Sequence, residues 1–158
     1  VTLSSLRSQV TIVHQDIYLF PDTIRNNIAY AKPEAPMEEI VKVARLAHIH
    51  DFIAGLPKGY DTLVGERGVT LSGGQRQRMA LARALLVNPK IVVLDDTTSE
   101  IDAETERAIY EALTCHLKGK TIIAITQRPS TMALADRVIY LEDGRVKYER
   151  RKVKEVVM

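Results

Sequence analysis

The sequence predicts an α/β fold in which helices cover a largely parallel β-sheet. Four short apolar segments rich in β-branched residues indicate strands that are buried on both faces. They span residues 10–14, 91–94, 122–125 and 138–141. A second observation supports the same class, because after residue 94 the strand patterns alternate with helical ones. We therefore expect a central parallel sheet that is interrupted between its first and second strands.

The segment between these two strands, roughly residues 20–88, is predicted to be a helical insert. The apolar residues that share one face of a helix there are Ile40, Val43, Ala44 and Ala47. Gly55, Pro57 and Gly59 end the next helix. Another helix follows Ser72. Its inner face is expected to contain Met79, Ala82 and Leu86.

Residues 89–148 are predicted to complete the α/β core. Asp102 is expected to cap the N-terminus of a helix after the second strand. The inner face of that helix would comprise Ile109, Ala112, Leu113 and Leu117. A strand, a short helix, another strand, a turn at residues 143–144 and a last short strand follow. With residues 1–19 as the end of an N-terminal core and 149–158 as a basic tail, we divide the chain into four segments.

The composition is that of a globular domain. The chain has 158 residues, of which 46% are apolar and 27% charged, and this length is enough to bury a core. Its net charge of +2 is too small to indicate a surface for nucleic acid. Residues 145–158 carry six basic and two acidic side chains, so the remainder of the chain has a charge of −2. We interpret the basic tail as a solvated end.

The cysteine and hydropathy patterns exclude several classes of protein. A single cysteine, Cys115, rules out an intrachain disulfide framework, and the four scattered histidines lack the spacing of a zinc site. A reducing compartment fits best, and Cys115 is expected to be a small packed residue. No apolar run reaches the roughly 18 to 20 residues that are needed to span a bilayer.

The run at residues 70–85, TLSGGQRQRMALARAL, carries the strongest functional signal. Ser72 followed by Gly73 and Gly74 lets backbone N–H groups approach an anion, and the positive end of the next helix points the same way. An alternative interpretation is a serine cap with glycines in a turn. Residues 71–75, LSGGQ, resemble the signature motif of ATP-binding cassette (ABC) proteins, and we prefer this interpretation.

Other stretches resemble further motifs of the same family, in the family's order. They are residues 13–20 (Q-loop), 90–96 (Walker B), 99–102 (D-loop) and 125–128 (switch region). The stretch 59–68, GYDTLVGERG, resembles the loop that precedes the signature in exporters of the multidrug and lipid-export type. The resemblance extends over about residues 1–147.

The resemblance implies a P-loop NTPase (RecA-like) core, incomplete in this chain, with an inserted α-helical subdomain. It also implies ATP and Mg²⁺ as cofactors. Asp95 and Gln15 would hold Mg²⁺, and the segment of Gln15 would contact a membrane domain. Asp96 would stand at the position of the catalytic base, and Gln127 at the γ-phosphate. The remaining cofactor-binding residues would be Ser72, Gly73, Gly74 and Gln75 of the signature and Asp102 of the D-loop.

In the family, two cassettes sandwich two nucleotides head to tail, so the signature of one chain completes the site of the other. The implied partners are therefore a second nucleotide-binding domain and the transmembrane domain, at the cytoplasmic face of a membrane. The whole protein would couple ATP binding and hydrolysis to export.

Two departures from the family pattern affect the same site. Asp96 replaces the glutamate that follows the Walker B aspartate, and its side chain is shorter by one methylene, or about 1.5 Å. Gln127 replaces the switch histidine, and its amide can donate a hydrogen bond but cannot take up a proton. Both changes weaken hydrolysis while permitting binding. The pattern is that of the degenerate subunit of a heterodimeric exporter.

No Walker A loop of the form GxxxxGK[ST] is found in the sequence. Residues 119–121, GKT, resemble its end, but residue 114 is threonine and the segment leads into a strand. We interpret it as a turn between a helix and a strand. Because the family's Walker A precedes the Q-loop, the resemblance implies a fragment of a cassette, with little ATPase activity as an isolated chain.

Three other functions remain open on the sequence alone. The domain could be a competent homodimeric ATPase, in which a shifted backbone repositions Asp96. It could be a soluble cassette ATPase that acts on nucleic acid or the ribosome, although the loop at 59–68 argues against this. It could also serve only as an interaction module that binds a partner cassette without turnover.

Overall fold

The structure is a computed structural model that describes residues 2–65, 68–96, 98 and 100–152. The chain forms two compact units, Val1–Ile125 and Thr126–Met158, and each is described by itself. Across the described residues, no helix combines the length and the hydrophobicity that crossing a membrane requires.

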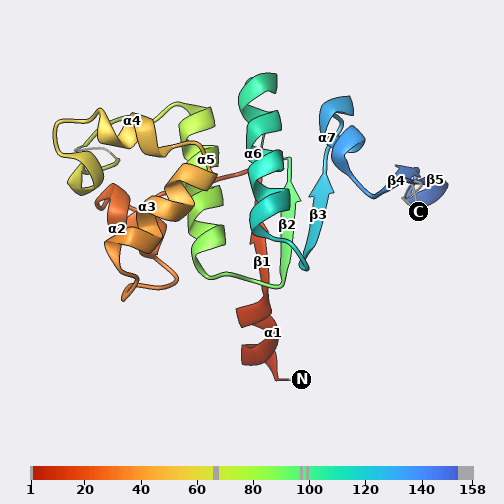
Figure 1. Cartoon of the computed structure of the whole chain (residues 1–158), viewed down its shortest axis with the longest axis horizontal. Helices are drawn as coiled ribbons and strands as arrows, with labels where there is room; N and C mark the ends of the chain where they lie inside the picture. The colour runs from red at the N-terminus through yellow and green to blue at the C-terminus, as the bar shows by residue number, and fades with distance from the viewer. Residues whose placement is uncertain (1, 66–67, 97, 99, 153–158) are drawn as a thin grey trace, which may run out of the picture. The chain divides into compact units, whose positions relative to one another are not determined.

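The first unit is built on a three-stranded parallel sheet with the order β1-β2-β3 (Figure 1). The strands are β1 (Val10–Val13), β2 (Ile91–Asp95) and β3 (Thr121–Ile125). The register aligns Val13 with Leu94, and Leu94 with Ala124. This confirms the predicted α/β class and its parallel sheet. All three strands therefore end at the same edge.

One expectation for this sheet is wrong, because only one of its faces is covered within the described residues. Val92 and Leu94 are fully buried in the core shared with the helices. The register places Ile12 and Ile123 on the opposite face, where they are 50% and 48% exposed. The described helices of this unit supply apolar side chains to the first face alone.

The predicted helical insert is confirmed. It contains α2 (Ile24–Ala29), α3 (Met37–Leu46), α4 (His50–Ala54), the short 3-10 helix η1 (Gly59–Asp61) and α5 (Gly73–Leu86). The apolar stripe predicted for α3 is buried, as is the inner face predicted for α5. These helices share one hydrophobic core with the sheet. A further helix, α1 (Leu3–Gln9), has no buried residue, so its sequence gave no periodic signal.

Helix α6 (Ala103–His116) joins β2 to β3 and lies against them (Figure 1). Its inner residues Ile109 and Leu113 are fully buried, as predicted. Cys115 is exposed, contrary to expectation, because two residues beyond Leu113 a helical side chain points to the opposite side. Gly119, at φ +81°, turns the chain into β3, so residues 119–121 form the predicted helix-to-strand turn.

The second unit contains α7 (Pro129–Leu134), β4 (Arg137–Glu142) and β5 (Arg145–Arg151). β4 was expected to be a doubly covered strand of the parallel sheet, and this is wrong. It pairs antiparallel with β5, and Leu141 is 72% exposed. The reason is the turn: Asp143 and Gly144 both adopt positive φ, as a tight hairpin turn requires, and so close a local pairing. β5 continues to Arg151, so the first residues of the predicted basic tail belong to this strand.

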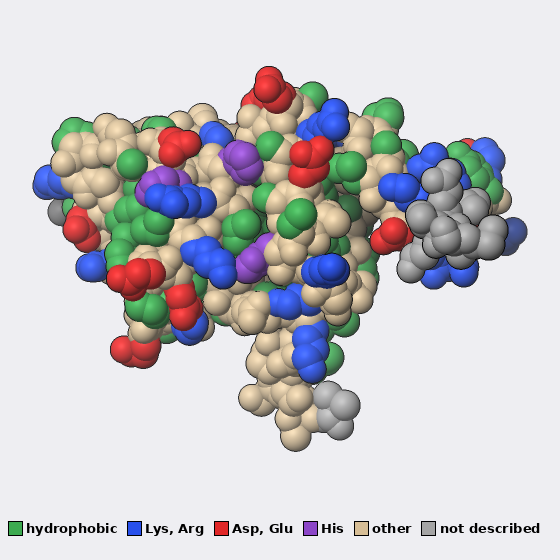
Figure 2. Space-filling view, viewed as in Figure 1, with side chains coloured by type: hydrophobic (Ala, Val, Ile, Leu, Met, Phe, Trp, Pro, Cys, Tyr) green, Lys and Arg blue, Asp and Glu red, His purple; other side chains and the backbone are tan. Residues whose placement is uncertain are grey.

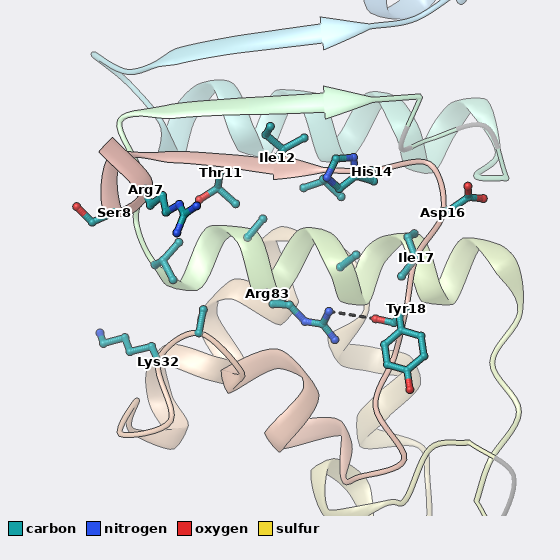
Figure 3. A pocket seen from close by; sticks show the side chains of 15 residues that line it. Arg7, Ser8, Thr11, Ile12, His14, Asp16, Ile17, Tyr18, Lys32 and Arg83 are labelled. Atoms are coloured by element: carbon teal, nitrogen blue, oxygen red, sulfur yellow. Dashed lines mark hydrogen bonds between the residues drawn. The ribbon is translucent and has the colours of Figure 1, made fainter. Parts of the chain in front are cut away.

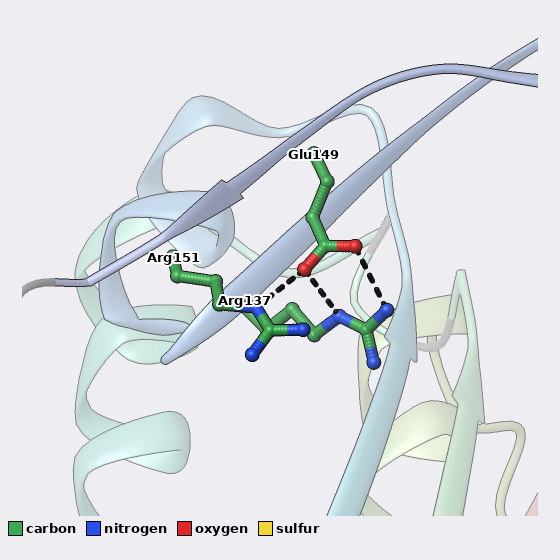
Figure 4. A network of polar contacts seen from close by, with 3 residues as sticks. All are labelled: Arg137, Glu149 and Arg151. Carbon is green, nitrogen blue, oxygen red and sulfur yellow. Dashed lines mark hydrogen bonds and ion pairs between the residues drawn. The ribbon is translucent and has the colours of Figure 1, made fainter.

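A network of charges crosses the hairpin (Figure 4). Arg137 donates two hydrogen bonds of 2.9 Å to the Glu149 carboxylate, and Arg151 donates one of 2.6 Å. The hydrogen bonds from Arg137 are the largest cause, and the one from Arg151 the next, of a pKa of Glu149 that is lowered to about 2. Tyr140 and Tyr148 stack across the strands at a centroid distance of 3.9 Å. The hairpin is therefore held by side chains on its own two strands.

Candidate functional site

The residues predicted to form the signature lie at a capped helix N-terminus. Ser72 Oγ accepts a hydrogen bond from the Gln75 N–H at 3.3 Å, and Gln75 Oε1 accepts one from the Ser72 N–H at 2.8 Å. The fourteen-residue helix α5 begins at Gly73. No acceptor for the N–H of Gly73 or of Gly74 is found among the described residues. Two free donors at the positive end of a long helix suit an anionic group such as a phosphate.

The turn before α6 passes against these glycines. A Cβ on Gly73 would coincide with the carboxylate of Glu100, and one on Gly74 would lie 2.8 Å from the Glu100 carbonyl oxygen. The Glu100 N–H donates to Gln77 Oε1 on α5 at 3.1 Å. Gly74 is therefore needed where the Glu100 backbone approaches α5, whereas at Gly73 the neighbour is the end of an exposed side chain. Glu100 belongs to the stretch 99–102 that resembles the D-loop, but its approach to Gly73 was not predicted, because nothing in a linear pattern places residue 100 beside residue 73.

A buried polar pair supports the same turn. The Thr98 hydroxyl donates to Glu106 Oε1 at 2.6 Å, and both side chains are buried. The Ile101 N–H donates to the Thr98 carbonyl at 3.0 Å. Asp102 caps α6, as predicted, by accepting from the Thr105 N–H at 2.8 Å. That backbone hydrogen bond is the main reason that the pKa of Asp102 is lowered. Ser99, the first residue of the proposed D-loop, lies outside the described residues.

The residues predicted to bind the metal and to act as the catalytic base lie at the carboxyl edge of the sheet. Asp95 ends β2, and Gln15 lies two residues beyond the end of the adjacent β1. Asp96 follows with φ 47°, and its N–H donates to the Ile125 carbonyl of β3 at 3.0 Å. A left-handed backbone at a residue other than glycine is uncommon and sets the direction of the Asp96 side chain. The topology thus brings Gln15, Asp95 and Asp96 to one edge, where ligands bind in parallel α/β sheets.

No cluster of three or more His, Cys, Asp or Glu side chains that could hold a metal ion occurs in the part of the chain that is described. One carboxylate and one amide oxygen, the donors predicted for Mg²⁺, suit this ion when it is bound with a nucleotide, since Mg²⁺ commonly takes one or two carboxylates and completes its shell with phosphate and water. Asp95 and Gln15, which were predicted to hold it, both carry side-chain oxygens and lie at this edge of the sheet. Gln127 lies in the second unit, where it is exposed and precedes α7.

An arginine on α5 holds the segment that follows Gln15. Arg83 donates to the carbonyls of Asn27 at 2.8 Å and Tyr18 at 3.1 Å, and to Asn27 Oδ1 at 3.1 Å. Its guanidinium lies 5.6 Å from the ring centroid of Phe20, which stacks on Tyr30. Burial lowers the pKa of Arg83. The segment predicted to be the Q-loop is thereby attached to α5, the helix that begins at the predicted signature.

A cavity of about 660 Å³ adjoins this contact, between β1 and α5 (Figure 3). Arg7, Lys32 and Arg83 contribute its basic groups, and Asp16 and Tyr18 belong to the segment after Gln15. Elsewhere on the face of the first unit shown in Figure 2, basic and acidic side chains are interspersed.

In the exporter-like loop, Tyr60 contacts His50 Nδ1 through its hydroxyl at 2.9 Å, and burial raises the pKa of Tyr60 to about 12. This contact fixes the start of the loop to α4. Residues 66 and 67 of the loop lie outside the described residues.

The sequence of the chain is similar to that of a known protein family. A family model described as "ABC transporter" matches residues 1–99. The chain is 51% identical over 145 residues to an "ATP-dependent lipid A-core flippase" of Photobacterium profundum, covering 91% of this chain and 25% of the flippase. It is 49% identical over 142 residues to a "Putative multidrug export ATP-binding/permease protein" of Staphylococcus aureus, covering 90% and 25%. The chain thus spans about a quarter of the length of these curated relatives.

A solved structure agrees in fold. The "Structure of a bacterial Atm1-family ABC exporter with ATP bound" superposes with a TM-score of 0.88 at 46% sequence identity, covering 94% of this chain and 26% of that one.

Proposed function

The chain belongs to the ABC transporter family, and we propose that it is the ATP-binding domain of an exporter, in which ATP binding and hydrolysis drive outward transport. The observation that carries the proposal is the pairing of two features on one sheet-and-helix framework. One is the carboxyl edge with Asp95 and Asp96, and the other is the capped N-terminus of α5, where the N–H groups of two glycines have no acceptor among the described residues. Exporters of lipids and drugs are among the proteins most similar to it.

Each residue then has a definite task. Asp95 and Gln15 hold Mg²⁺, and Asp96 orients the attacking water. Bound ATP supplies the phosphoanhydride whose cleavage releases the free energy for transport. Ser72, Gly73, Gly74 and Gln75 donate hydrogen bonds to a phosphate held mainly by a second cassette, with Asp102 beside them. The segment after Gln15, fixed by Arg83, faces the transmembrane domain at the cytoplasmic side of the membrane.

We further propose that this chain's own site binds ATP and hydrolyses it slowly. The Asp96 carboxylate is retracted by about 1.5 Å relative to glutamate, and a positioned base contributes roughly a hundredfold to ten-thousandfold in rate. Gln127 can donate to a phosphate but cannot exchange a proton. The signature, in contrast, is complete, so this chain would serve a competent site in a heterodimeric partner. As an isolated chain it would have little ATPase activity.

Restoring both side chains tests this proposal. In the full-length transporter, Asp96→Glu together with Gln127→His should raise the rate of ATP hydrolysis at least tenfold, because a base of full reach is restored. Steady-state phosphate release measures the rate. Asp51→Glu, which lengthens an exposed acid on α4 by the same methylene, is the matched control and should leave the rate of ATP hydrolysis unchanged.

A competent homodimer is the second candidate, and the left-handed backbone of Asp96 favours it, because φ 47° redirects the short carboxylate. The same experiment separates the two. If the double variant hydrolyses ATP no faster than the wild type, Asp96 is already positioned and the slow site is refuted.

A further inference from the structure

We propose that Arg83 is a positioning residue for Gln15: by holding the segment after β1 against α5, it fixes the place from which the Gln15 side chain reaches Mg²⁺. This inference rests on the proposed function, because it concerns the metal ion assigned to Gln15 there. Arg83 itself is not among the residues assigned to the ion or to the nucleotide, so it would act through the backbone that it holds.

The first observation is how Gln15 is held in the chain. It lies within residues 14–20, which form neither a helix nor a strand. On one side the chain is fixed by β1, whose last residue, Val13, is buried and paired with β2. On the other side the Tyr18 carbonyl accepts a hydrogen bond of 3.1 Å from Arg83, as Figure 3 shows. Gln15 therefore stands between two fixed points, and Arg83 provides the second of them.

The second observation is that the Arg83 guanidinium is held both at its edge and at its face. Besides Tyr18, it donates to the carbonyl of Asn27 at 2.8 Å and to the Asn27 side-chain oxygen at 3.1 Å. It lies 5.6 Å from the ring centroid of Phe20 and 5.8 Å from that of Tyr30, and these two rings stack on each other. Hydrogen bonds and ring contacts together fix the orientation of a planar group, which a lysine ammonium does not reproduce.

The third observation is that this charge is half-buried and no ion pair to Arg83 is found in the part of the chain that the structure describes. Burial lowers the pKa of Arg83. Withdrawing a charge from water without a counter-ion costs free energy, so the charge as such stabilises the fold little. What the guanidinium supplies instead is directed hydrogen bonds to two segments, and these determine where the backbone beyond Gln15 lies.

The test measures metal binding rather than turnover. Mn²⁺, in place of Mg²⁺, is titrated into the full-length transporter bound to a non-hydrolysable ATP analogue, and electron paramagnetic resonance reports the bound ion. Arg83→Met should weaken Mn²⁺ binding at this chain's site about tenfold, the lower end of the cost of losing a group that orients a metal ligand. Arg83→Lys should lose less, because it keeps one donor. Affinity for the analogue without metal should stay unchanged in both variants, whereas a general loss of structure would lower it too.

A second background shows whether Arg83 acts through Gln15. In Gln15→Ala, which lacks the side-chain oxygen, adding Arg83→Met should weaken Mn²⁺ binding no further. Arg25→Met removes an exposed arginine of α2 and is the matched control, which should bind Mn²⁺ as the wild type does.

Two sets of outcomes separate the positioning role from the proposed function. An equal loss on adding Arg83→Met in both backgrounds, or no loss in either, would overturn the positioning role and leave the proposed function intact. If the wild type bound no Mn²⁺ with the analogue, or if Gln15→Ala bound it as tightly as the wild type, the metal-binding task given to Gln15 would fail, and the positioning role with it.

Discussion

At the scale of single residues, Arg83 shows how one side chain can connect two functional segments. It carries three hydrogen bonds to Asn27 and Tyr18 and contacts the Phe20 ring. Asn27 is itself buried and exchanges hydrogen bonds of 2.9 Å with the backbone of Phe20. The segment after Gln15 thus depends on side chains from α2 and α5 rather than on regular backbone pairing.

Removing the guanidinium should loosen that segment. We expect Arg83→Met to lower the free energy of unfolding by about 2 kcal/mol, because it leaves the buried Asn27 side chain with fewer partners. Arg83→Lys should recover only part of the loss, since it keeps the charge without the planar fork. Denaturant unfolding measures stability, and hydrogen exchange over residues 18–30 locates the effect.

Arg25→Met is the control, because within the part of the chain that the structure describes its side chain forms just one exposed ion pair, with Asp61 at 3.5 Å. Its cost should stay below about 0.5 kcal/mol. A cost for Arg83→Met no larger than this would contradict the role given to Arg83.

At the scale of elements, the hairpin β4–β5 is a local structure held by its turn and by charges. The pKa of Glu149 is lowered to about 2 in the folded hairpin, against an ordinary value near 4.5. Because the folded hairpin lowers the pKa of this carboxylate, the ionised Glu149 stabilises the hairpin fully above pH 4.5. This stabilisation is lost as pH falls from about 4.5 towards 2. Because Glu149 makes exposed ion pairs, the effect should also weaken with salt.

We therefore predict that acid weakens the hairpin of the wild type between pH 5 and pH 2 in low salt, whereas Glu149→Gln shows a flatter profile. Nuclear magnetic resonance shifts of Tyr140 and Tyr148, which stack across the strands, report the pairing. A wild-type profile that matches Glu149→Gln would show that the carboxylate is not held by its arginines.

The elements themselves were largely predictable, for physical reasons. Strands and helices with a buried face have a periodic apolar pattern, and β1, β2, β3, α3, α5 and α6 were found from it. β4 was misassigned to the parallel sheet because its apolar composition resembles a buried strand, whereas its partner is decided by the positive φ of Asp143 and Gly144. Helix α1 was missed because it buries nothing.

At the scale of the whole molecule, the candidate site depends on contacts between distant segments. Gln15 and Asp95 are 80 positions apart in sequence and share an edge only because β1 and β2 pair in parallel. The family resemblance implied that both residues hold Mg²⁺, and the strand register places them at one edge. The contact of Glu100 with Gly73 and the hydrogen bonds of Arg83 were not predictable, since they depend on how loops pack against α5.

The central claim is that one site of the assembled exporter binds ATP without efficient hydrolysis. A single-turnover experiment on the full-length transporter tests it directly, by trapping the nucleotides bound to each cassette pair and separating ATP from ADP. The proposed slow hydrolysis by this chain's own site predicts that about one ATP per cassette pair stays intact while the other is hydrolysed. Hydrolysis of both nucleotides at the same rate would contradict the claim.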